Sequence, residues 1–354
     1  MSESTTSTRI PKTVNGLAII LGMGNIGDPN NYMVRFPTVE SAKAYLSAYA
    51  KRGYRQLDGA RNYPPGAPET CEPVMGEVLE LINAEEKEGA GVLDGIPFIV
   101  DTKLRYKPPN THSAELVAKS IRDSLEALRL DKVHIEYLHS IDNTSDTRET
   151  CRAMDEAFRA GKFEKFGLCN ASVAQLDDFY KACEDQNLIV RPTVYQGDYN
   201  ILSRSCEDGI LEKARQYRMP FYAFSPAGGG LLNSKDYRER QGGRFDINTK
   251  MGQSYHETWY ASSPLTRAAE SLRDLSQTHD INGHHLALRW IIWHSNLSGL
   301  YGDGIILGSS SIEQLNSNLD AIESGPLPEE AAREIEGIWA TLKREEKEAN
   351  QGDK

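Results

Sequence analysis

Short apolar runs alternate with longer amphipathic segments along almost the whole sequence. We predict eight strands, with a helix after each of them. The strands are expected at residues 16–24, 54–58, 98–104, 133–139, 166–170, 193–200, 220–225 and 304–309. The helices are expected at residues 39–52, 70–83, 113–128, 146–161, 172–185, 206–217, 265–278 and 311–322. Such regular alternation indicates an α/β protein with a parallel sheet, because parallel neighbours need a crossover between them.

Some of these strands have centres that are apolar at every position, such as FIV at residues 98–100 and AII at residues 18–20. Strands of this kind are buried on both faces, which is typical of a parallel sheet covered by helices. Eight strand–helix units suit a closed (β/α)8 TIM barrel better than an open sheet. A doubly wound open sheet is the alternative. It is disfavoured because no acid is clearly placed about 20 residues beyond the glycines of the first strand, where a dinucleotide-binding sheet needs one.

We treat residues 1–354 as a single barrel domain, with residues 1–14 as a flexible N-terminal extension. Two segments interrupt the repeat. Residues 84–95 are charged and rich in glycine, and we interpret them as an insertion or an extension of the preceding helix. Residues 228–263 form a long loop after the seventh strand, and we expect a lid there because long loops in compact domains are commonly functional. Further helices are expected at residues 284–294 and 328–348.

The composition excludes several classes of protein. Asp and Glu outnumber Lys and Arg by 51 to 40, so the net charge is -11 and the isoelectric point is about 5.3. A protein that binds nucleic acid needs a basic face, so we expect no such partner. No run approaches the roughly 18 apolar residues of a membrane-spanning helix, and the polar start MSESTTSTRI lacks the apolar centre of a signal peptide. We therefore expect a cytoplasmic protein without a membrane partner.

The sequence contains no strong metal-binding pattern. Its five cysteines form no CxxC pair, which argues against a structural zinc site and against a disulfide framework. Three histidines, His279, His284 and His285, lie close together in the sequence, but on a polar stretch outside the predicted strands. We therefore predict that the protein holds no metal.

Polar side chains stand at the ends of consecutive predicted strands. Asp58, Lys103, His139, Asn170 and Gln196 each lie at or near the C-terminal end of a strand. In a barrel these ends meet at the mouth that carries the chemistry. Each residue alone has an ordinary interpretation, as a turn aspartate, a solvent-exposed lysine or a core histidine. All of them at one mouth predict a functional site.

Tyr63 completes this set, five residues beyond Asp58. A phenol has a pKa near ~10, so it is a poor acid or base at neutral pH unless a cation lies beside it. Lys103 is the expected cation, and Asp58 is expected to hold its ammonium in place. This arrangement suits a carbonyl reductase, in which hydride reaches the carbon while Tyr63 protonates the oxygen and His139 donates a hydrogen bond to it.

The pattern Asp58-x-Ala60-x-x-Tyr63, followed by Lys103 and His139, resembles the catalytic tetrad of the aldo-keto reductase superfamily. The resemblance extends from about residue 17 to residue 345 and is closest to the aflatoxin-aldehyde-reductase-like branch. It implies an NADPH-dependent enzyme that reduces a small-molecule aldehyde or ketone, reversibly. A homodimer is implied by this branch alone. Other segments that carry the resemblance are FGLCN (166–170), VYQGDYN (194–200), AFSPAGGGLL (223–232), GRF (243–245), ALRWIIWHS (287–295) and residues 302–327.

The resemblance also implies which residues hold NADPH. Asn170 and Gln196 would bind the nicotinamide carboxamide, and Phe224 would stack on the ring. The loop over the pyrophosphate would include Ser225, Pro226, Leu231, Lys235 and Arg244. The adenosine ribose and its 2′-phosphate would lie at a helix N-terminus, where free amides favour anions. The residues implied there are Ser309, Ser310, Ser311, Gln314 and Asn318.

The chain departs from the better-known superfamily pattern at the 2′-phosphate. That pattern has a lysine and an arginine where this chain has Gly308 and Gln314. Arg244 and Lys235 are the nearest candidates for the missing positive charge. Substrate contacts are expected from loops in which the resemblance is weakest, at residues 25–35, 64–73, 141–147 and 235–263.

Two alternative functions stay open at this point. A nucleotide-binding regulatory barrel with little turnover would share the fold, but it has no need of Tyr63 and Lys103 together. A Schiff-base aldolase would use Lys103 as its nucleophile, but it has no need of the cofactor-like C-terminal segment. Some motifs also have local interpretations, because residues 309–311 suit an N-cap cluster and residues 228–230 suit a flexible turn.

Overall fold

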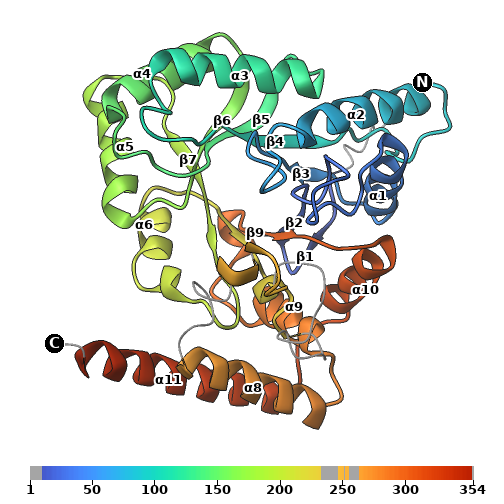
Figure 1. Cartoon of the computed structure of the whole chain (residues 1–354), viewed down its shortest axis with the longest axis vertical. Coiled ribbons are helices and arrows are strands. Elements are labelled where there is room, and N and C mark those ends of the chain that lie inside the picture. The colour runs from blue at the N-terminus through green and yellow to red at the C-terminus, as the bar shows by residue number, and fades with distance from the viewer. Residues whose placement is uncertain (1–9, 233–245, 251, 255–262, 353–354) are drawn as a thin grey trace, which may run out of the picture.

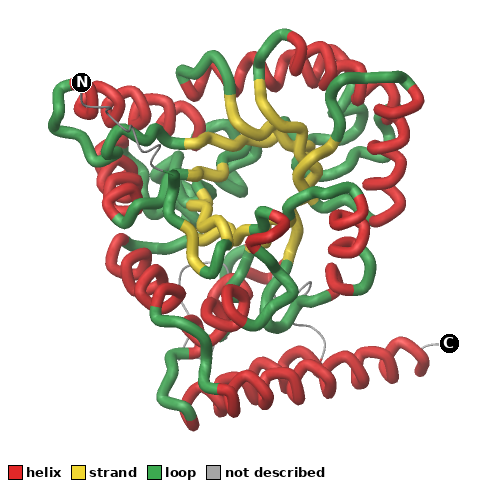
Figure 2. Tube along the Cα trace, turned by 180° about the vertical axis from the view of Figure 1, so that it is seen from behind, coloured by secondary structure: helices red, strands yellow, loops and turns green. Residues whose placement is uncertain are grey.

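The computed structural model describes residues 10–232, 246–250, 252–254 and 263–352. Eight parallel strands form a closed barrel with helices around it (Figures 1 and 2). Neighbouring strands pair in chain order, and the pairing of Ala18 with Gly304 joins the first barrel strand to the last. The predicted (β/α)8 TIM barrel is therefore confirmed. Its strands are β2 (Leu17–Gly22), β3 (Gln56–Asp58), β4 (Ile99–Lys103), β5 (Val133–Leu138), β6 (Phe163–Cys169), β7 (Pro192–Asp198), β8 (Phe221–Phe224) and β9 (Gly304–Leu307).

Helices follow the strands around the outside of the barrel. Local sequence sets where several of them begin. Thr38 accepts a hydrogen bond from the amide of Ser41, whose hydroxyl accepts one from the Thr38 amide, and this capping box starts α1. The two helices α8 and α11 pack against each other outside the ring (Figure 1). The helices are α1 (Val39–Lys51), α2 (Cys71–Lys87), α3 (Ala114–Leu128), α4 (Thr147–Arg159), α5 (Val173–Asp185), α6 (Ile210–Gln216), α8 (Ser263–Thr278), α9 (Gly283–Trp293), α10 (Ile312–Glu323) and α11 (Glu329–Gly352).

The prediction of a flexible extension was wrong for its last two residues. They form β1 (Thr13–Val14), which pairs antiparallel with β2. The connecting residues Asn15 and Gly16 both have positive φ (50° and 75°). Asparagine followed by glycine is a common tight-turn pair because both residues tolerate this backbone conformation. The chain therefore enters the barrel through a hairpin.

Two other segments also differ from their predicted boundaries. α2 continues to Lys87 and so takes up the beginning of the segment that we interpreted as an insertion or helix extension. The predicted helix at residues 206–217 is interrupted at Gly209, whose φ of 137° is open to glycine but strained for other residues. A 3₁₀ turn, η1 (Ser205–Glu207), precedes the interruption, and α6 follows it.

The long loop after β8 begins with a 3₁₀ turn, η2 (Gly228–Gly230), and a similar turn, η4 (Gly299–Tyr301), precedes β9. Residues 233–245, 251 and 255–262 lie outside the described part of the chain, so the lid stays a prediction. The C-terminal helix is confirmed as α11. None of the helices that the structure describes is long and apolar enough to span a membrane.

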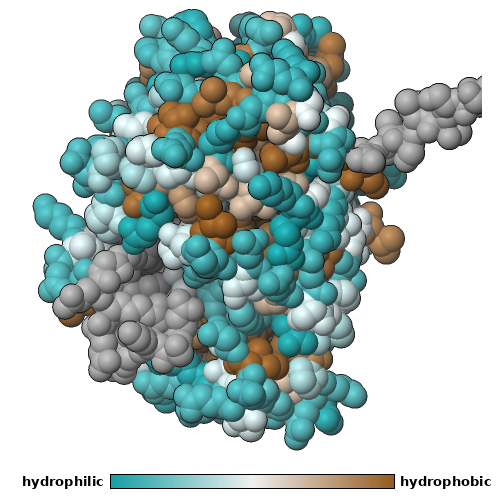
Figure 3. Space-filling view, turned by 90° about the vertical axis from the view of Figure 1, so that its right-hand side faces the viewer, coloured by the Kyte–Doolittle hydropathy of each residue, from teal (hydrophilic) through white to brown (hydrophobic). Residues whose placement is uncertain are grey.

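The barrel is filled rather than hollow. A compact apolar cluster occupies its interior, and a larger one lies between the strands and the helices. The surface in Figure 3 is mostly hydrophilic, with apolar side chains in scattered groups. Because the interior is packed, small molecules have access to the barrel only at a mouth. The interior cluster consists of Ile20, Ile135, Tyr137, Cys169, Val194, Tyr222 and Ile306.

Candidate active site

The barrel register brings the polar strand ends together. Asp58 is the last residue of β3, Lys103 is the last of β4, and His139 follows β5. Asp58 lies level with Gly22 of β2, and Lys103 lies level with Tyr137 of β5. Parallel strands all end at the same edge, so these side chains converge on one mouth. The structure therefore assembles the predicted tetrad residues, although their catalytic roles remain predictions.

Lys103 is the centre of this group. Its Nζ lies 2.7 Å from both carboxylate oxygens of Asp58 and 2.9 Å from the carbonyl oxygen of Gly59. The Lys103 side chain is fully buried. Burial by itself favours the neutral amine, but the negative charge of Asp58 outweighs it and raises the pKa of Lys103 above its usual value. The side chain is therefore an ammonium at neutral pH.

Tyr63 lies beside this ammonium. Its hydroxyl oxygen is 3.5 Å from Lys103 Nζ and 3.5 Å from Asp58 Oδ2. The expectation that Lys103 makes the phenol more acidic is only partly met. Burial raises the pKa of Tyr63 above its usual value by more than the lysine lowers it. Tyr63 is therefore fully protonated at neutral pH, which is the form that a proton donor needs.

His139 faces Tyr63 edge to face. The ring centroids are 5.6 Å apart and the planes are nearly perpendicular, at 89°. Burial, together with the positive charges of Lys103 and Arg105, lowers the pKa of His139 to about 3. The imidazole is therefore neutral. Its Nδ1 has no hydrogen-bond partner within the described part of the chain. A neutral imidazole has one N–H, and the nitrogen that carries it can donate a hydrogen bond to a ligand oxygen.

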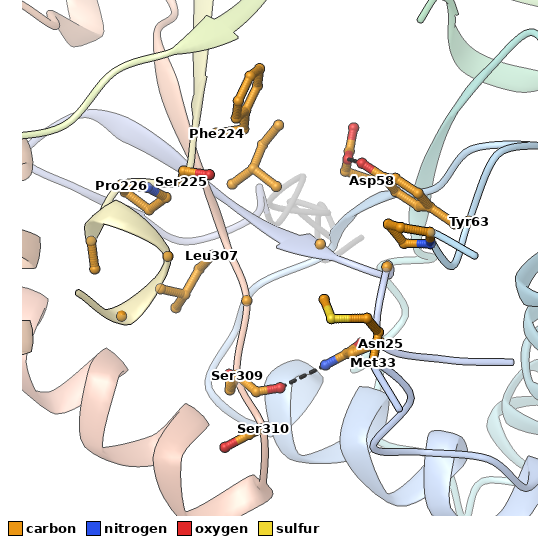
Figure 4. A pocket seen from close by; sticks show the side chains of 18 of the residues that line it. Asn25, Met33, Asp58, Tyr63, Phe224, Ser225, Pro226, Leu307, Ser309 and Ser310 are labelled. Atoms are coloured by element: carbon orange, nitrogen blue, oxygen red, sulfur yellow. Dashed lines mark hydrogen bonds between the residues drawn. The ribbon is translucent and has the colours of Figure 1, made fainter. Parts of the chain in front are cut away.

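A cavity of about 540 Å³ extends from this group across the mouth of the barrel. In Figure 4, Tyr63 and Asp58 lie on one side of it, and Phe224, Ser225 and Pro226 lie across from them. The structure thus brings most of the predicted site residues to one cavity, with Lys103 buried beneath it. The predicted residues that line the cavity are Asp58, Tyr63, His139, Asn170, Gln196, Phe224, Ser225, Pro226, Ser309, Ser310 and Gln314.

Asn170 and Gln196 place two amides next to the tetrad. The Nδ2 of Asn170 donates to the carbonyl oxygen of His139 at 3.1 Å, and Asn170 has a positive φ of 57°. The Nε2 of Gln196 donates to Asp58 Oδ1 at 2.9 Å. Asparagine tolerates the left-handed conformation better than most residues, and here it turns the side chain toward the mouth. Each amide still has hydrogen-bonding capacity for a ligand.

Three predicted cofactor residues do not line the cavity. Leu231 is fully buried in the larger apolar cluster, so its side chain packs and only its backbone is left to approach a ligand. Ser311 is the N-cap of α10 and accepts a hydrogen bond from the Gln314 amide at 3.2 Å, as the N-cap interpretation predicts. Asn318 lies farther along α10 and is buried. Lys235 and Arg244 lie outside the described residues.

Two of the loops expected to contact substrate do line cavities, but sequence reasoning did not identify which side chains reach them. From residues 25–35, the main cavity receives Asn25, Met33 and Arg35. A second cavity of about 250 Å³ shares Tyr63, Pro65 and His139 with the first. Its other lining residues are Asn62, Gly66, Pro68 and Arg105. For these lining residues the sequence offered one signal. Arg105 lies two residues beyond Lys103, just after the end of a predicted strand, and so near the mouth of the barrel.

The main cavity suits a nicotinamide dinucleotide. Amides and an aromatic ring lie at its tetrad end, where the nicotinamide is expected. Three consecutive glycines in η2 have positive φ (58°, 64° and 94°), and a side chain at Gly308 would point into open space, so both segments leave room for a ligand near the backbone. On α10, one turn beyond Gln314 of the lining, Nδ2 of Asn318 is a buried donor without a partner among the described residues. Such a donor is costly unless a ligand or water satisfies it.

Comparison with known proteins agrees with this geometry. The model of the Aldo/keto reductase family matches residues 18–340. An aldo-keto reductase of Pseudocercospora fijiensis is 35% identical over 306 residues, which cover 84% of this chain and 97% of the relative. The oxidoreductase sirO of Leptosphaeria maculans is 31% identical, covering 92% and 95%. Aflatoxin B1 aldehyde reductase member 2 of Mus musculus is 30% identical, covering 88% and 84%.

The mouth of the barrel holds a protonated tyrosine beside a buried lysine–aspartate pair. The family match covers most of the chain, and this protein therefore belongs to the aldo/keto reductase family. It is an NAD(P)H-dependent oxidoreductase. The similarity to aflatoxin aldehyde reductases confirms the branch that the sequence motifs predict.

Proposed function

We propose that this protein is an NADPH-dependent carbonyl reductase in which Tyr63 is the general acid. The observation that carries the proposal is the position of Tyr63. Its hydroxyl lies 3.5 Å from the buried Lys103 ammonium, and its side chain lines both cavities. A cofactor in the larger cavity and a carbonyl compound in the smaller one would meet at this residue and at His139.

The chemistry follows from the charges of these groups. Bound NADPH supplies the hydride that reduces the carbonyl carbon. As the C=O double bond becomes a single bond, negative charge develops on its oxygen, and the protonated Tyr63 transfers its proton there. Neutral His139 donates a hydrogen bond to the same oxygen. The Lys103 ammonium, held by Asp58, then stabilises the tyrosinate that remains. In the reverse direction the tyrosinate accepts the proton of an alcohol.

The two alternative functions are less well supported. A Schiff-base lysine needs a neutral, accessible amine. Lys103 is instead fully buried, and three close oxygen contacts and a raised pKa keep it charged. A regulatory barrel needs no acid at the junction of two cavities, and this structure keeps Tyr63 there with its hydroxyl near Lys103.

The substrate is proposed to bind in the smaller cavity. Arg105 is the ionised side chain of its lining, and its Nε is 3.0 Å from Glu69. Asn62 is fixed there, because its amide donates to the carbonyl oxygen of Tyr106 and accepts from the Tyr106 amide. A cytoplasmic location and a homodimer, as in our sequence predictions, complete the proposal. Imaging of the tagged protein and light scattering on purified protein test these two points.

The proposal is tested with purified protein and its Tyr63→Phe variant. We expect wild-type protein to quench its tryptophan fluorescence on addition of NADPH and to consume NADPH with an aldehyde panel. The variant should bind NADPH as wild type does but lose reduction at least ~100-fold, because general acid catalysis is removed and the ring is retained. Full activity in the variant would refute the role of Tyr63. Failure of folded wild-type protein to bind NADPH or NADH would refute the cofactor assignment.

A further inference from the structure

The loop between β2 and α1 reaches across the main cavity toward α10. Nδ2 of Asn25 donates to the carbonyl oxygen of Ser309 at 2.6 Å (Figure 4). Farther along the loop, Phe36 stacks on Tyr45 of α1 with ring centroids 4.0 Å apart, and the Tyr45 hydroxyl lies 3.3 Å from the Ser309 hydroxyl. Two independent contacts therefore tie this loop to the segment in which the adenosine end of the cofactor is expected.

Arg35 stands between these two contacts. Its amide donates to the carbonyl oxygen of Asn25 at 2.8 Å, and its neighbour Phe36 forms a bridge with Ile26. The backbone of Arg35 is therefore fixed next to the residue that holds Ser309. Its side chain lines the main cavity together with Ser309, Ser310 and Gln314.

The guanidinium of Arg35 is oriented but not neutralised. Its Nη1 donates to the carbonyl oxygens of Tyr32 and Val34, at 2.6 and 3.2 Å. Within the part of the chain that the structure describes, no carboxylate forms an ion pair with it, although most other arginines there have one. A positive charge that lines a ligand cavity without a counterion is a natural binding group for an anion.

The start of α10 also favours an anion but, among the residues that the structure describes there, includes no cation. α10 begins at Ile312, and the Gln314 side chain turns back to accept from the amide and the hydroxyl of Ser310 at 2.6 and 2.7 Å. Gln314 and Gly308 occupy the two positions at which the better-known superfamily pattern has positive charges. The helix N-terminus contributes partial positive charge, so the full charge must come from another element.

We infer that Arg35 binds the 2′-phosphate of NADPH and sets the preference of this enzyme for NADPH over NADH. The inference rests on the proposed function, because it assumes that the adenosine end of the cofactor lies against Ser309 and Ser310. Arg35 thus supplies, from the loop after β2, the charge that is absent at Gly308 and Gln314. Its guanidinium forms charge-assisted hydrogen bonds to the phosphate, and NADH has no group in that position.

The test is equilibrium binding, followed by tryptophan or NADPH fluorescence, to the wild type and to Arg35→Met, Arg35→Lys and the control Arg122→Met. Arg122 is an exposed arginine of α3, with 66% of its side chain accessible. We expect Arg35→Met to weaken NADPH binding ~10- to 100-fold and NADH binding less than ~2-fold. Arg35→Lys should lie between wild type and Arg35→Met, because it keeps the charge without the forked donors. Arg122→Met should bind both as wild type does.

A second pair of probes isolates the phosphate. Adenosine 2′,5′-bisphosphate and 5′-AMP differ only in the 2′-phosphate, so Arg35→Met should weaken the first and leave the second unchanged. Equal losses for both members of a pair, or unchanged NADPH binding, would overturn the role of Arg35 while leaving the reductase proposal intact. Wild-type protein that binds neither dinucleotide would instead refute the proposed function. Thermal unfolding of each variant confirms that it is folded.

Discussion

Replacing Lys103 by methionine tests the centre of the site, because it removes a buried charge and keeps the length of the side chain. Lys103 Nζ lies 3.5 Å from the Tyr63 hydroxyl. At an effective dielectric constant of about 20, an ammonium at that distance stabilises a tyrosinate by about 5 kcal/mol. This corresponds to about 3.5 pKa units of the phenol. We expect Lys103→Met to reduce the rate of carbonyl reduction by about 1000-fold, measured as NADPH consumption in single-turnover experiments.

The same substitution has a separate cost in stability. It leaves the Asp58 carboxylate, which is 1% exposed, with the Gln196 amide at 2.9 Å and the Tyr63 hydroxyl at 3.5 Å as its side-chain partners among the described residues. Removing one partner of a buried ion pair destabilises a protein by about 3–5 kcal/mol. The double variant Asp58→Asn with Lys103→Met has no uncompensated charge. We therefore expect urea unfolding to show that the double variant regains most of the lost stability, while its reduction rate stays low.

The two measurements separate catalysis from folding. Lys103→Arg is the matched control, because it keeps the positive charge in a larger group. It should retain more activity than Lys103→Met if charge is the important property. The reasoning is refuted if Lys103→Met reduces aldehydes within about tenfold of wild type while it is folded. It is also refuted if the double variant recovers activity together with stability, because the defect would then be structural.

Three further predictions concern other parts of the molecule. The pKa of His139 is depressed to about 3, so between about pH 6.5 and 3 the unfolded chain binds a proton at this residue and the native state does not. The free energy of unfolding should therefore fall as the pH drops from 6.5 toward 3. His139→Gln should lessen this pH dependence, measured by urea unfolding at each pH. Arg204→Ala should destabilise the protein by about 2 kcal/mol, because the buried guanidinium stacks on Trp290 at 4.0 Å. It should also increase hydrogen exchange in α11, because the guanidinium lies 2.8 Å from Glu336 of that helix; unchanged exchange would contradict this. Gly76→Ala should lower the unfolding temperature, because the added Cβ would lie 2.2 Å from the carbonyl oxygen of Ala127.

Some features of the site depend on which groups meet in space. The positions of Asp58, Lys103 and His139 at strand ends, with Tyr63 on the loop after Asp58, are enough to predict that these side chains meet at one mouth. The net pKa of Tyr63 cannot be predicted in this way, because it depends on a balance between burial and the nearby Lys103 charge. A sequence gives the identity of both groups but neither the depth of the phenol nor its distance from the ammonium.

Local sequence determined the strands and helices, because apolar periodicity, capping residues and turn glycines act within a few residues. The regular alternation of these elements also determined the barrel, because eight parallel strands with crossover helices have few other ways to bury their apolar faces. Tertiary structure alone decided which of the loop side chains without a predicted role face the cavities. Arg35 and Arg105 line the site, whereas Leu231, for which a cofactor contact was predicted, packs into the core. The physical reason is that contacts between segments far apart in the sequence direct a loop side chain. One example is the contact of Asn25 with Ser309, which are 284 residues apart, and no local sequence pattern predicts such a contact.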